Sequence, residues 1–234
     1  MCNLDLIKEL YEMCADESFD IGRAIELIND IDVNRPLQFY SSGEDLTFLE
    51  PEEKIDPEKE IEWSTFLTSA SEHLNYAMCK FLLDKGADPN YEDSNVEPLM
   101  SHLRYLGYYS DCDTEDEYQE LIYKQLNIVR LLLEYGANPN QYIDHSVYGK
   151  HTNMIDALLL AIDLIGRESD VSYLKRFLIY IVAYGADYDD GRKIDFLYTL
   201  DKDNLNQYDA KFVKEGDYWF PVITDKDEKI VAWL

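Results

Sequence analysis

The clearest pattern of apolar positions lies in residues 126–140. The apolar residues fall at i, i+3, i+4 and i+7, one face of an α-helix, and are Ile128, Leu131, Leu132 and Tyr135. Gly136 follows them, and glycine commonly ends a helix because it adopts the left-handed backbone conformation without a Cβ penalty. The next residues are Ala-Asn-Pro-Asn, and the proline cannot continue a helix. The segment therefore predicts an amphipathic helix followed by a tight exit turn.

The same pattern recurs at two other places in the chain. Residues 78–90 repeat it almost residue for residue, and residues 177–189 repeat it in a more apolar form. A shortened version without the glycine, Ile-Asp-Val-Asn, ends residues 1–34. That segment carries helical patterns at residues 4–14 and 21–29, with Asp20 as a good N-cap for the second. We interpret residues 1–34 as a degenerate N-terminal capping repeat, because terminal repeats are often atypical.

The rest of the chain alternates between helical patterns and polar interruptions. Residues 35–62 are rich in proline and acid and predict a long acidic loop, with room for a brief strand at 46–49. Further insertions are expected at residues 107–117 and 141–153. The remaining helices are expected at residues 63–70, 97–106, from about 118, 154–163, 171–184, 194–200 and 208–214. Residues 218–234 predict a β-hairpin turning at 225–228, with Pro221 on an edge strand.

Helix pairs that close on Gly-Ala-Asp/Asn-Pro-Asn resemble ankyrin repeats. The matching residues are 86–90, 136–140 and 185–187, and residues 128–133 match the second helix of the family. The family's Thr-Pro-Leu-His start of the first helix survives only in fragments, at residues 65–67, 97–99 and 156–158. Asn90, Asn140 and Asp189 lie 50 and 49 residues apart, against an ordinary ankyrin period of ~33 residues, so insertions must separate the repeats.

The resemblance covers about residues 15–200 and implies a curved stack whose concave face and loops bind other proteins. The fold class expected is an all-α repeat solenoid of stacked ankyrin-like helix pairs with a C-terminal β-hairpin. Its parts are the capping repeat at 1–34, the acidic loop at 35–62, ankyrin-like repeats with insertions at 63–200, and a C-terminal cap containing the hairpin at 201–234.

Charge changes the functional picture. The chain has 234 residues with 48 acidic and 21 basic side chains, for a formal net charge of -27. Such a surface repels phosphate backbones and is poorly attracted to anionic membranes, so neither nucleic acid nor membrane is an expected partner. It would attract a basic protein, although solubility alone is an equally good explanation of the charge.

The cysteines and the N-terminus favour a cytoplasmic protein. Cys2, Cys14, Cys79 and Cys112 lack the close spacing of a disulfide framework or a zinc site. The first residues lack the basic segment and apolar run of a signal peptide. No apolar stretch reaches the ~18 residues that suggest a membrane span.

The search for catalytic motifs predicts no enzyme, cofactor or metal. The sequence has no phosphate loop, dinucleotide fingerprint or His-Glu-x-x-His pair. Residues 111–117 begin like a calcium loop, but Asp116 stands where the sixth-position glycine is needed. Ser172 and Lys175 match a Ser-x-x-Lys spacing, but the serine lies at a helix start, where it is an ordinary capping residue.

The insertions carry the candidate partner-binding residues. Tyrosine offers a large contact area at low entropy cost and is enriched at binding hot spots, whereas Tyr135 and Tyr180 lie on repeat helices and are expected to pack. The candidates are Tyr91, Glu92, Asp93, Tyr108, Tyr109, Asp111, Asp113, Tyr142, His145, Tyr148 and His151.

The function predicted is a non-enzymatic protein-binding module. One version is an acidic inhibitor or immunity-type protein that masks a basic partner, and a related one mimics the charge of nucleic acid. The alternative is a structural scaffold or homo-oligomer that assembles through the C-terminal hairpin, although a monomer is expected, with the hairpin capping the last repeat.

Overall fold

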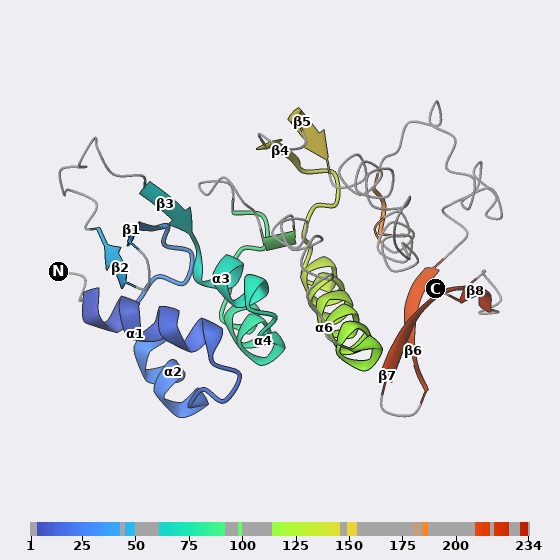
Figure 1. The fold of residues 1–234 in the computed structure, drawn as a ribbon, viewed down its shortest axis with the longest axis horizontal. Helices are drawn as coiled ribbons and strands as arrows, with labels where there is room; N and C mark the ends of the chain where they lie inside the picture. The colour runs from blue at the N-terminus through green and yellow to red at the C-terminus, as the bar shows by residue number, and fades with distance from the viewer. Residues whose placement is uncertain are drawn as a thin grey trace. The chain divides into compact units, whose positions relative to one another are not determined.

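Figure 1 shows the fold of the chain in a computed structural model. The structure describes residues 4–42, 45–49, 61–91, 98–99, 114–145, 149–153, 181, 184–186, 209–215, 218–224 and 230–233. The chain divides into two compact units. Unit 1 comprises Met1–Arg104 and Ile128–Ala137, and unit 2 comprises Tyr105–Asn127 and Asn138–Leu234. The predicted helices at 154–163 and 194–200 lie outside the described residues, as does most of those at 97–106 and 171–184.

Unit 1 begins with two helices, α1 (Leu4–Ala15) and α2 (Ile21–Ile28). The predicted apolar face of α1 contributes Ile7, Leu10 and Cys14 to the core, each at most 1% exposed. The N-cap prediction for α2 is confirmed, because the Asp20 carboxylate accepts hydrogen bonds from the backbone N–H groups of Gly22 and Arg23.

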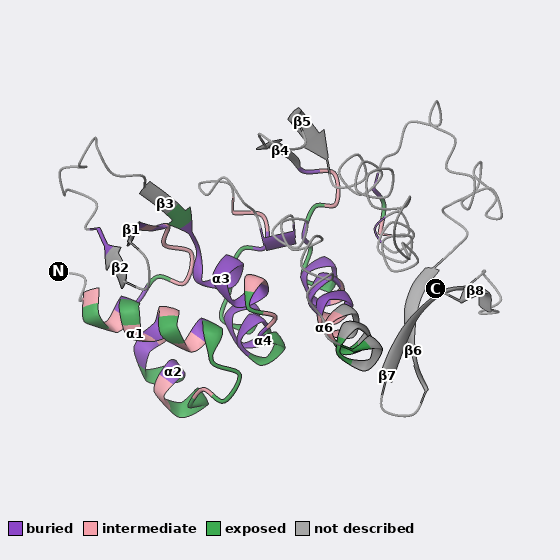
Figure 2. Cartoon of the chain, viewed as in Figure 1, coloured by how far each residue is buried: buried purple, intermediate pink, exposed green. Residues whose placement is uncertain are grey.

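A second helix pair, α3 (Phe66–Glu72) and α4 (Tyr76–Asp84), packs against α1. Residues Phe66 to Ser71 are all buried, so α3 lies in the core of unit 1 (Figure 2). Thr65 caps α3 by accepting a bond from the Thr68 N–H at 3.0 Å. The predicted helix at 63–70 therefore starts later, at Phe66, because Trp63 and Ser64 belong to a strand.

Asn75 joins the two helix pairs. Its side chain, 1% exposed, caps α4 by accepting a bond from the Met78 N–H. Its amide nitrogen lies 3.3, 3.2 and 2.9 Å from the carbonyl oxygens of Met13, Cys14 and Asp16. One side chain thus satisfies the start of α4 and the end of α1, both of which would otherwise leave buried backbone groups unpaired.

The exit turns after α4 and α6 (Glu115–Glu134) share one geometry. Gly86 and Gly136 have φ of +92° and +90°. Ala87 and Ala137 donate to the carbonyls of Leu82 and Leu132, five residues earlier, at 3.0 and 2.9 Å. This is the Schellman arrangement that ends a helix. Both alanines are buried, as the tight turn requires of a small residue.

The described residues of the third turn lie in unit 2 and follow the same pattern. Gly185 has φ of +89°, and Ala186 donates to the carbonyl of Ile181 at 3.1 Å. Ala186 is 6% exposed, close to its counterparts Ala87 and Ala137. The local chemistry of the three segments therefore produces one conformation in all of them.

The acidic segment 35–62 contains a sheet, which corrects the prediction of a long loop and confirms the brief strand expected at 46–49 as β2. Strands β1 (Leu37–Ser42), β2 (Asp45–Phe48) and β3 (Ile61–Ser64) form an antiparallel sheet of order β2-β1-β3. Phe39 and Phe48 are cross-strand partners with ring centroids 5.5 Å apart. Tyr11 of α1 contacts both rings, at 5.7 and 5.2 Å. This aromatic contact between distant segments stabilises the sheet, and local sequence patterns do not reveal it.

Helix α6 begins earlier than the predicted residue 118. Thr114 and Glu117 form a reciprocal cap, in which the Thr114 hydroxyl accepts from the Glu117 N–H and the Glu117 carboxylate accepts from the Thr114 N–H, both at 3.2 Å. Residues 115–117 are therefore helical, which is incompatible with a calcium loop across 111–117.

Two further β-structures belong to unit 2. Strands β4 (Tyr142–His145) and β5 (Gly149–Asn153) form a hairpin within the insertion 141–153, which the sequence predicted only as an excursion. Strands β6 (Asp209–Glu215), β7 (Tyr218–Thr224) and β8 (Ile230–Trp233) form an antiparallel sheet of order β6-β7-β8. Strands β7 and β8 pair where the sequence predicts a hairpin.

Strand β6 corrects two predictions. The helix predicted at 208–214 is wrong, because all seven residues of β6 pair with β7, and such long-range pairing overrides a weak local helical pattern. Pro221 therefore lies on the central strand rather than on an edge strand. Pro221 is the cross-strand partner of Phe212 on β6, and the described pairing with β8 starts at Val222.

Candidate protein-binding surface

Four of the eleven predicted contact residues lie in the described part of the chain: Tyr91, Tyr142, His145 and His151. The others lie outside it and are Glu92, Asp93, Tyr108, Tyr109, Asp111, Asp113 and Tyr148. Tyr91 is half-buried directly after the exit turn of α4. The preceding residue, Asn90, donates to the Gly136 carbonyl at 2.9 Å, so Tyr91 is anchored at its N-terminal side to a fixed turn.

The β4–β5 hairpin carries three of the predicted contact residues, Tyr142, His145 and His151. Tyr142 is the cross-strand partner of Asn153, and His145 is the partner of Gly149. The pairing register shifts between Ile143 and His145, which marks a bulge or irregularity.

The structure shows a polar network on α4 and α6 that the sequence analysis missed. Lys80 donates to Asp84 at 2.8 Å and lies 3.2 Å from the Tyr135 hydroxyl. That hydroxyl donates to the second oxygen of Asp84. The Lys80 Nζ also lies 5.7 Å from the centroid of the Tyr135 ring. The hydrogen bond from Lys80, followed by that from Tyr135, lowers the pKa of Asp84 below its usual value. The hydrogen bonds of Lys80 to Asp84 and then to Tyr135 raise the pKa of Lys80.

A parallel contact joins the next turn of the same helices. Arg130 donates to the Tyr76 hydroxyl at 3.3 Å and lies 3.7 Å from the Glu134 carboxylate. Tyr76 and Tyr135 are 36% and 38% exposed. The prediction that Tyr135 packs in the core is therefore wrong, although the other members of its apolar face, Ile128, Leu131 and Leu132, are buried. The sequence signal for the exposure of Tyr135 is its position at the end of the helix, directly before Gly136.

A different surface lies on α2 of unit 1. Ile21 and Ile25 are the most exposed large apolar residues in the described part of the chain, at 57% and 42%. Arg23 on the same helix donates to both Glu9 oxygens, at 2.7 and 2.8 Å, and to Glu26 at 3.1 Å. The bidentate Arg23–Glu9 contact joins α2 to α1 and lowers the pKa of the Glu9 carboxyl.

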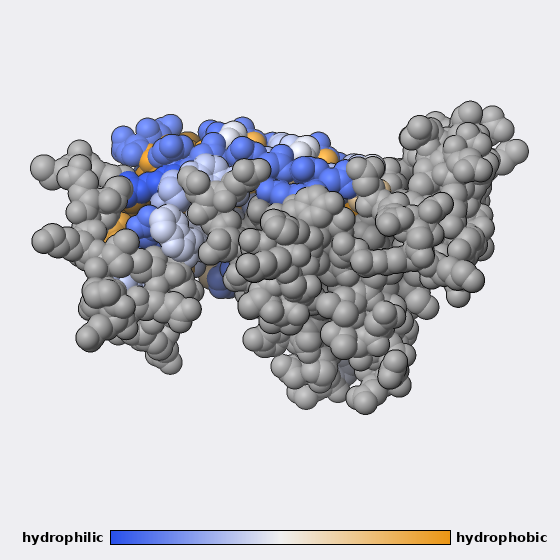
Figure 3. Space-filling view, turned by 90° about the horizontal axis from the view of Figure 1, so that it is seen from above, coloured by the Kyte–Doolittle hydropathy of each residue, from blue (hydrophilic) through white to orange (hydrophobic). Residues whose placement is uncertain are grey.

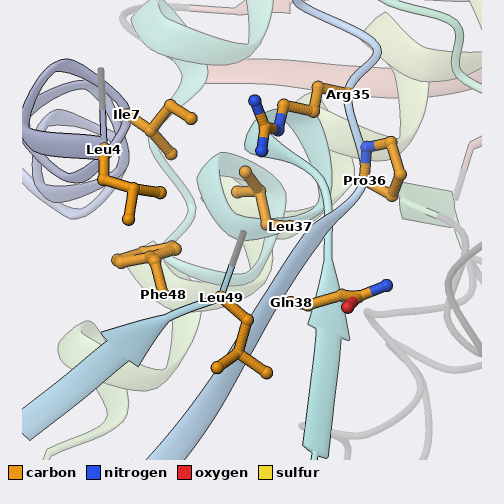
Figure 4. Close-up of a pocket in the computed structure, with 8 residues that line it drawn as sticks. All are labelled: Leu4, Ile7, Arg35, Pro36, Leu37, Gln38, Phe48 and Leu49. Atoms are coloured by element: carbon orange, nitrogen blue, oxygen red, sulfur yellow. The ribbon is translucent and has the colours of Figure 1, made fainter. Parts of the chain in front are cut away.

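The described residues include one small hollow and no group that could hold a metal ion. One hollow in unit 1 lies between α1 and the sheet, where Leu4, Ile7, Leu37 and Phe48 gather (Figure 4). Its volume of ≈ 10 Å³ is on the order of what one water molecule needs. Within the described ranges, no group of three or more His, Cys, Asp or Glu residues could hold a metal ion.

Two buried thiols are chemically quiet. Cys14 and Cys79 are free cysteines at 0% exposure, and the Cys14 thiol donates to the Leu10 carbonyl at 3.4 Å. Burial raises the pKa of both thiols, so neither forms the reactive thiolate at neutral pH. Both residues therefore serve as small apolar core groups.

The described residues seen in Figure 3 are mostly hydrophilic, with small hydrophobic patches between them. No helix in the described part of the chain is long and apolar enough to cross a membrane. Comparison of the sequence with models of known protein families found no match, and comparison with curated proteins found none either.

Proposed function

We propose that this chain is a non-enzymatic, ankyrin-type protein-binding module that recognises a basic protein. The observation that carries the proposal is the recurrence of one turn and one hydrogen bond. Asn34 and Asn90 donate to the carbonyls of Gly86 and Gly136 in unit 1, at 3.0 and 2.9 Å. Asn140 donates to the carbonyl of Gly185 in unit 2, at 3.0 Å.

A recurrent bond of this kind supports a repeat protein, because each repeat in such a protein is stabilised mainly by its neighbours. Each asparagine is itself held by the Asx residue two positions earlier, since Asp32, Asp88 and Asn138 accept from its backbone N–H at 3.0, 2.9 and 3.0 Å. The turns therefore present rigid edges between the insertions. Rigid edges carrying variable insertions are well suited to binding other proteins.

Charge supports a basic partner. The chain has 48 acidic and 21 basic side chains, which gives the net charge of -27. Within unit 1 the Lys8, Arg23, Lys80 and Arg130 side chains all lie in ion pairs with acidic neighbours. The remaining acidic excess would accelerate association with a basic protein at low salt.

The sharper form of the proposal is an inhibitor or immunity-type protein that masks a basic partner, such as a nuclease toxin, in the cytoplasm. Its support is by analogy with small acidic ankyrin-type proteins that serve this role. In this form the protein acts as a monomer and needs neither cofactor nor metal.

Affinity capture tests the proposal. The full chain, immobilised by a terminal tag, would be exposed to host lysate at low salt and eluted with a salt gradient, and the eluted proteins identified by mass spectrometry. We expect a basic protein that elutes as salt is raised, because exposed charge attraction is screened. A matched acidic protein of unrelated fold serves as the control. Recovery of only acidic proteins, or of the same basic proteins on the control, would refute the proposal.

A further inference from the structure

Helix α2 buries only part of its apolar face. Ala24 and Leu27 are buried against the core of unit 1. Ile21, Ile25 and Ile28 fall at i, i+4 and i+7, so they line one edge of that face, next to Ala24. Ile21 and Ile25 are exposed, and Ile28 is half-buried. Exposed residues of α2 are visible in Figure 2. We call these three isoleucines the α2 stripe.

The α2 stripe differs from the exposed tyrosine rings of unit 1. The exposed rings of Tyr76 and Tyr135 each have a hydroxyl engaged by a polar neighbour. Isoleucine has no polar group, so its exposure costs free energy without a compensating hydrogen bond. The stripe places two such side chains on successive turns of one helix, which is the spacing that an amphipathic partner segment matches.

The stretch of chain that carries the α2 stripe is strongly acidic. Between residues 4 and 34 the only basic side chains are Lys8 and Arg23, and both are already paired with glutamates. The acidic side chains of the same stretch are Asp5, Glu9, Glu12, Asp16, Glu17, Asp20, Glu26, Asp30 and Asp32. An occupant of the stripe must therefore bring apolar side chains flanked by positive charge.

We propose that the α2 stripe docks an amphipathic basic segment of the partner protein, with apolar side chains on Ile21 and Ile25 and Lys or Arg residues toward the acidic rim. This inference rests on the proposed function. It adds the place on the chain, helix α2, at which the basic partner binds. Two isoleucines cannot form a whole interface, which buries ~1,600 Å² in a typical stable complex. The stripe is therefore one anchor within a larger contact.

A defined peptide tests the docking. The probe is a fluorescently labelled amphipathic helix of leucine and lysine, and its charge-reversed version of leucine and glutamate is the control. Binding to the full chain would be measured by anisotropy for the wild type, for Ile21→Gln/Ile25→Gln, and for Trp63→Gln. Trp63 is 37% exposed on β3 and serves as the matched apolar control. Circular dichroism and urea midpoints would check that both variants fold.

We expect the wild type and Trp63→Gln to bind the lysine peptide with the same affinity. The double variant should bind it on the order of 10- to 100-fold more weakly, because it loses the binding free energy of about one fully buried isoleucine. The glutamate peptide should not bind. Equal binding by the folded double variant would overturn the docking site and leave the proposed function standing. Absence of binding to the wild type would overturn the docking site, and capture of no basic protein from lysate would separately refute the function.

Sedimentation of the wild type and the double variant distinguishes a competing occupant. A monomer in both supports the proposal. A wild-type dimer that the double variant loses would overturn it, because the occupant would then be a second copy of this chain.

Discussion

The Asn90 side-chain amide donates to the backbone carbonyl oxygen of Gly136 at 2.9 Å, across 46 residues of sequence. The oxygen of the Asn34 side chain shows why asparagine is needed at such a position. This oxygen accepts a hydrogen bond from the Asp88 N–H at 2.7 Å, and the nitrogen of the same Asn34 amide donates to the Gly86 carbonyl. One side-chain amide therefore fixes both sides of the neighbouring turn. Asp189 occupies the position in the third segment that matches Asn90 and Asn140. An ionised carboxylate has no hydrogen to donate, so Asp189 cannot form the same bond to a backbone carbonyl.

Replacing Asn90 tests the contribution of this bond to stability. Asn90→Ala should lower the free energy of unfolding by about 1 kcal/mol, because one hydrogen bond is lost at a partly exposed site where water can replace it. Asn90→Asp should cost more, since it brings a negative charge toward the Gly136 carbonyl. Urea unfolding followed by circular dichroism measures both. Asn29→Ala, at an exposed position on the α2 C-cap, is the control. Equal midpoints for Asn90→Asp and the wild type would contradict the account.

Asn75 should be far more sensitive than Asn90 because it is buried. Asn75→Ala leaves the Met78 N–H and the α1 carbonyls without their partner, and each unsatisfied buried group costs roughly 1–3 kcal/mol. We expect a loss of about 3 kcal/mol or more in urea unfolding. Asn75→Asp keeps the cap on α4 but loses the donors to α1, so it separates the two roles. A loss below about 0.5 kcal/mol for both variants would show that the packing does not depend on Asn75.

The exit turn after α6 should require a left-handed residue at position 136. A Cβ built on Gly136 meets no atom within 4 Å, so the cost of substitution is conformational rather than steric crowding by neighbours. Gly136→Ala should therefore destabilise by about 1–2 kcal/mol. Gly136→Asn should cost less, because asparagine tolerates the left-handed conformation better. Thermal unfolding of the two variants compares them directly, and a variant pair with the opposite order would contradict the turn geometry.

The Lys80–Asp84–Tyr135 network should make stability depend on acidity. The pKa of Asp84 is lowered in the folded state, mainly by the Lys80 hydrogen bond and then by Tyr135. Its contribution is therefore present above the unfolded value near 3.8 and is lost as pH falls through the lower folded-state pKa.

Asp84→Asn provides the test of that linkage. The wild type should exceed Asp84→Asn in urea midpoint at pH 7, and the difference should shrink by pH 3. Because the network is exposed, added salt should also reduce the difference. A difference that is unchanged between pH 7 and pH 3 would show that Asp84 is not ionised in a stabilising contact.

The parts of the fold that sequence predicted well are those governed by local chemistry. The glycine, Asx and proline of residues 86–90 and 136–140 act on their own backbone, so the turn can be anticipated from a few residues. The same holds for Asp20 at the start of α2. Even the glycine-free turn ending at Asn34 makes the bond to Gly86, because it keeps the asparagine and the preceding Asp32.

The parts that sequence missed depend on contacts between distant segments. The β1–β3 sheet is stabilised by Tyr11 against Phe39 and Phe48, a contact that no pattern within residues 35–62 reveals. Strand β6 exists because β7 pairs with it along its whole length. The candidate surface shows the same limit. The hydroxyl of Tyr135 forms hydrogen bonds with Lys80 and Asp84, which lie 55 and 51 residues away.

The association rate of the captured partner with this chain, measured against ionic strength, tests the central claim most directly. Stopped-flow fluorescence between about 20 and 300 mM salt would give the rate, with the dissociation rate measured in parallel. We predict an association rate that falls by roughly tenfold or more over this range while dissociation changes little, as steering by an acidic surface requires. An association rate that does not change with salt would contradict the claim that this chain recognises a basic protein through its charge.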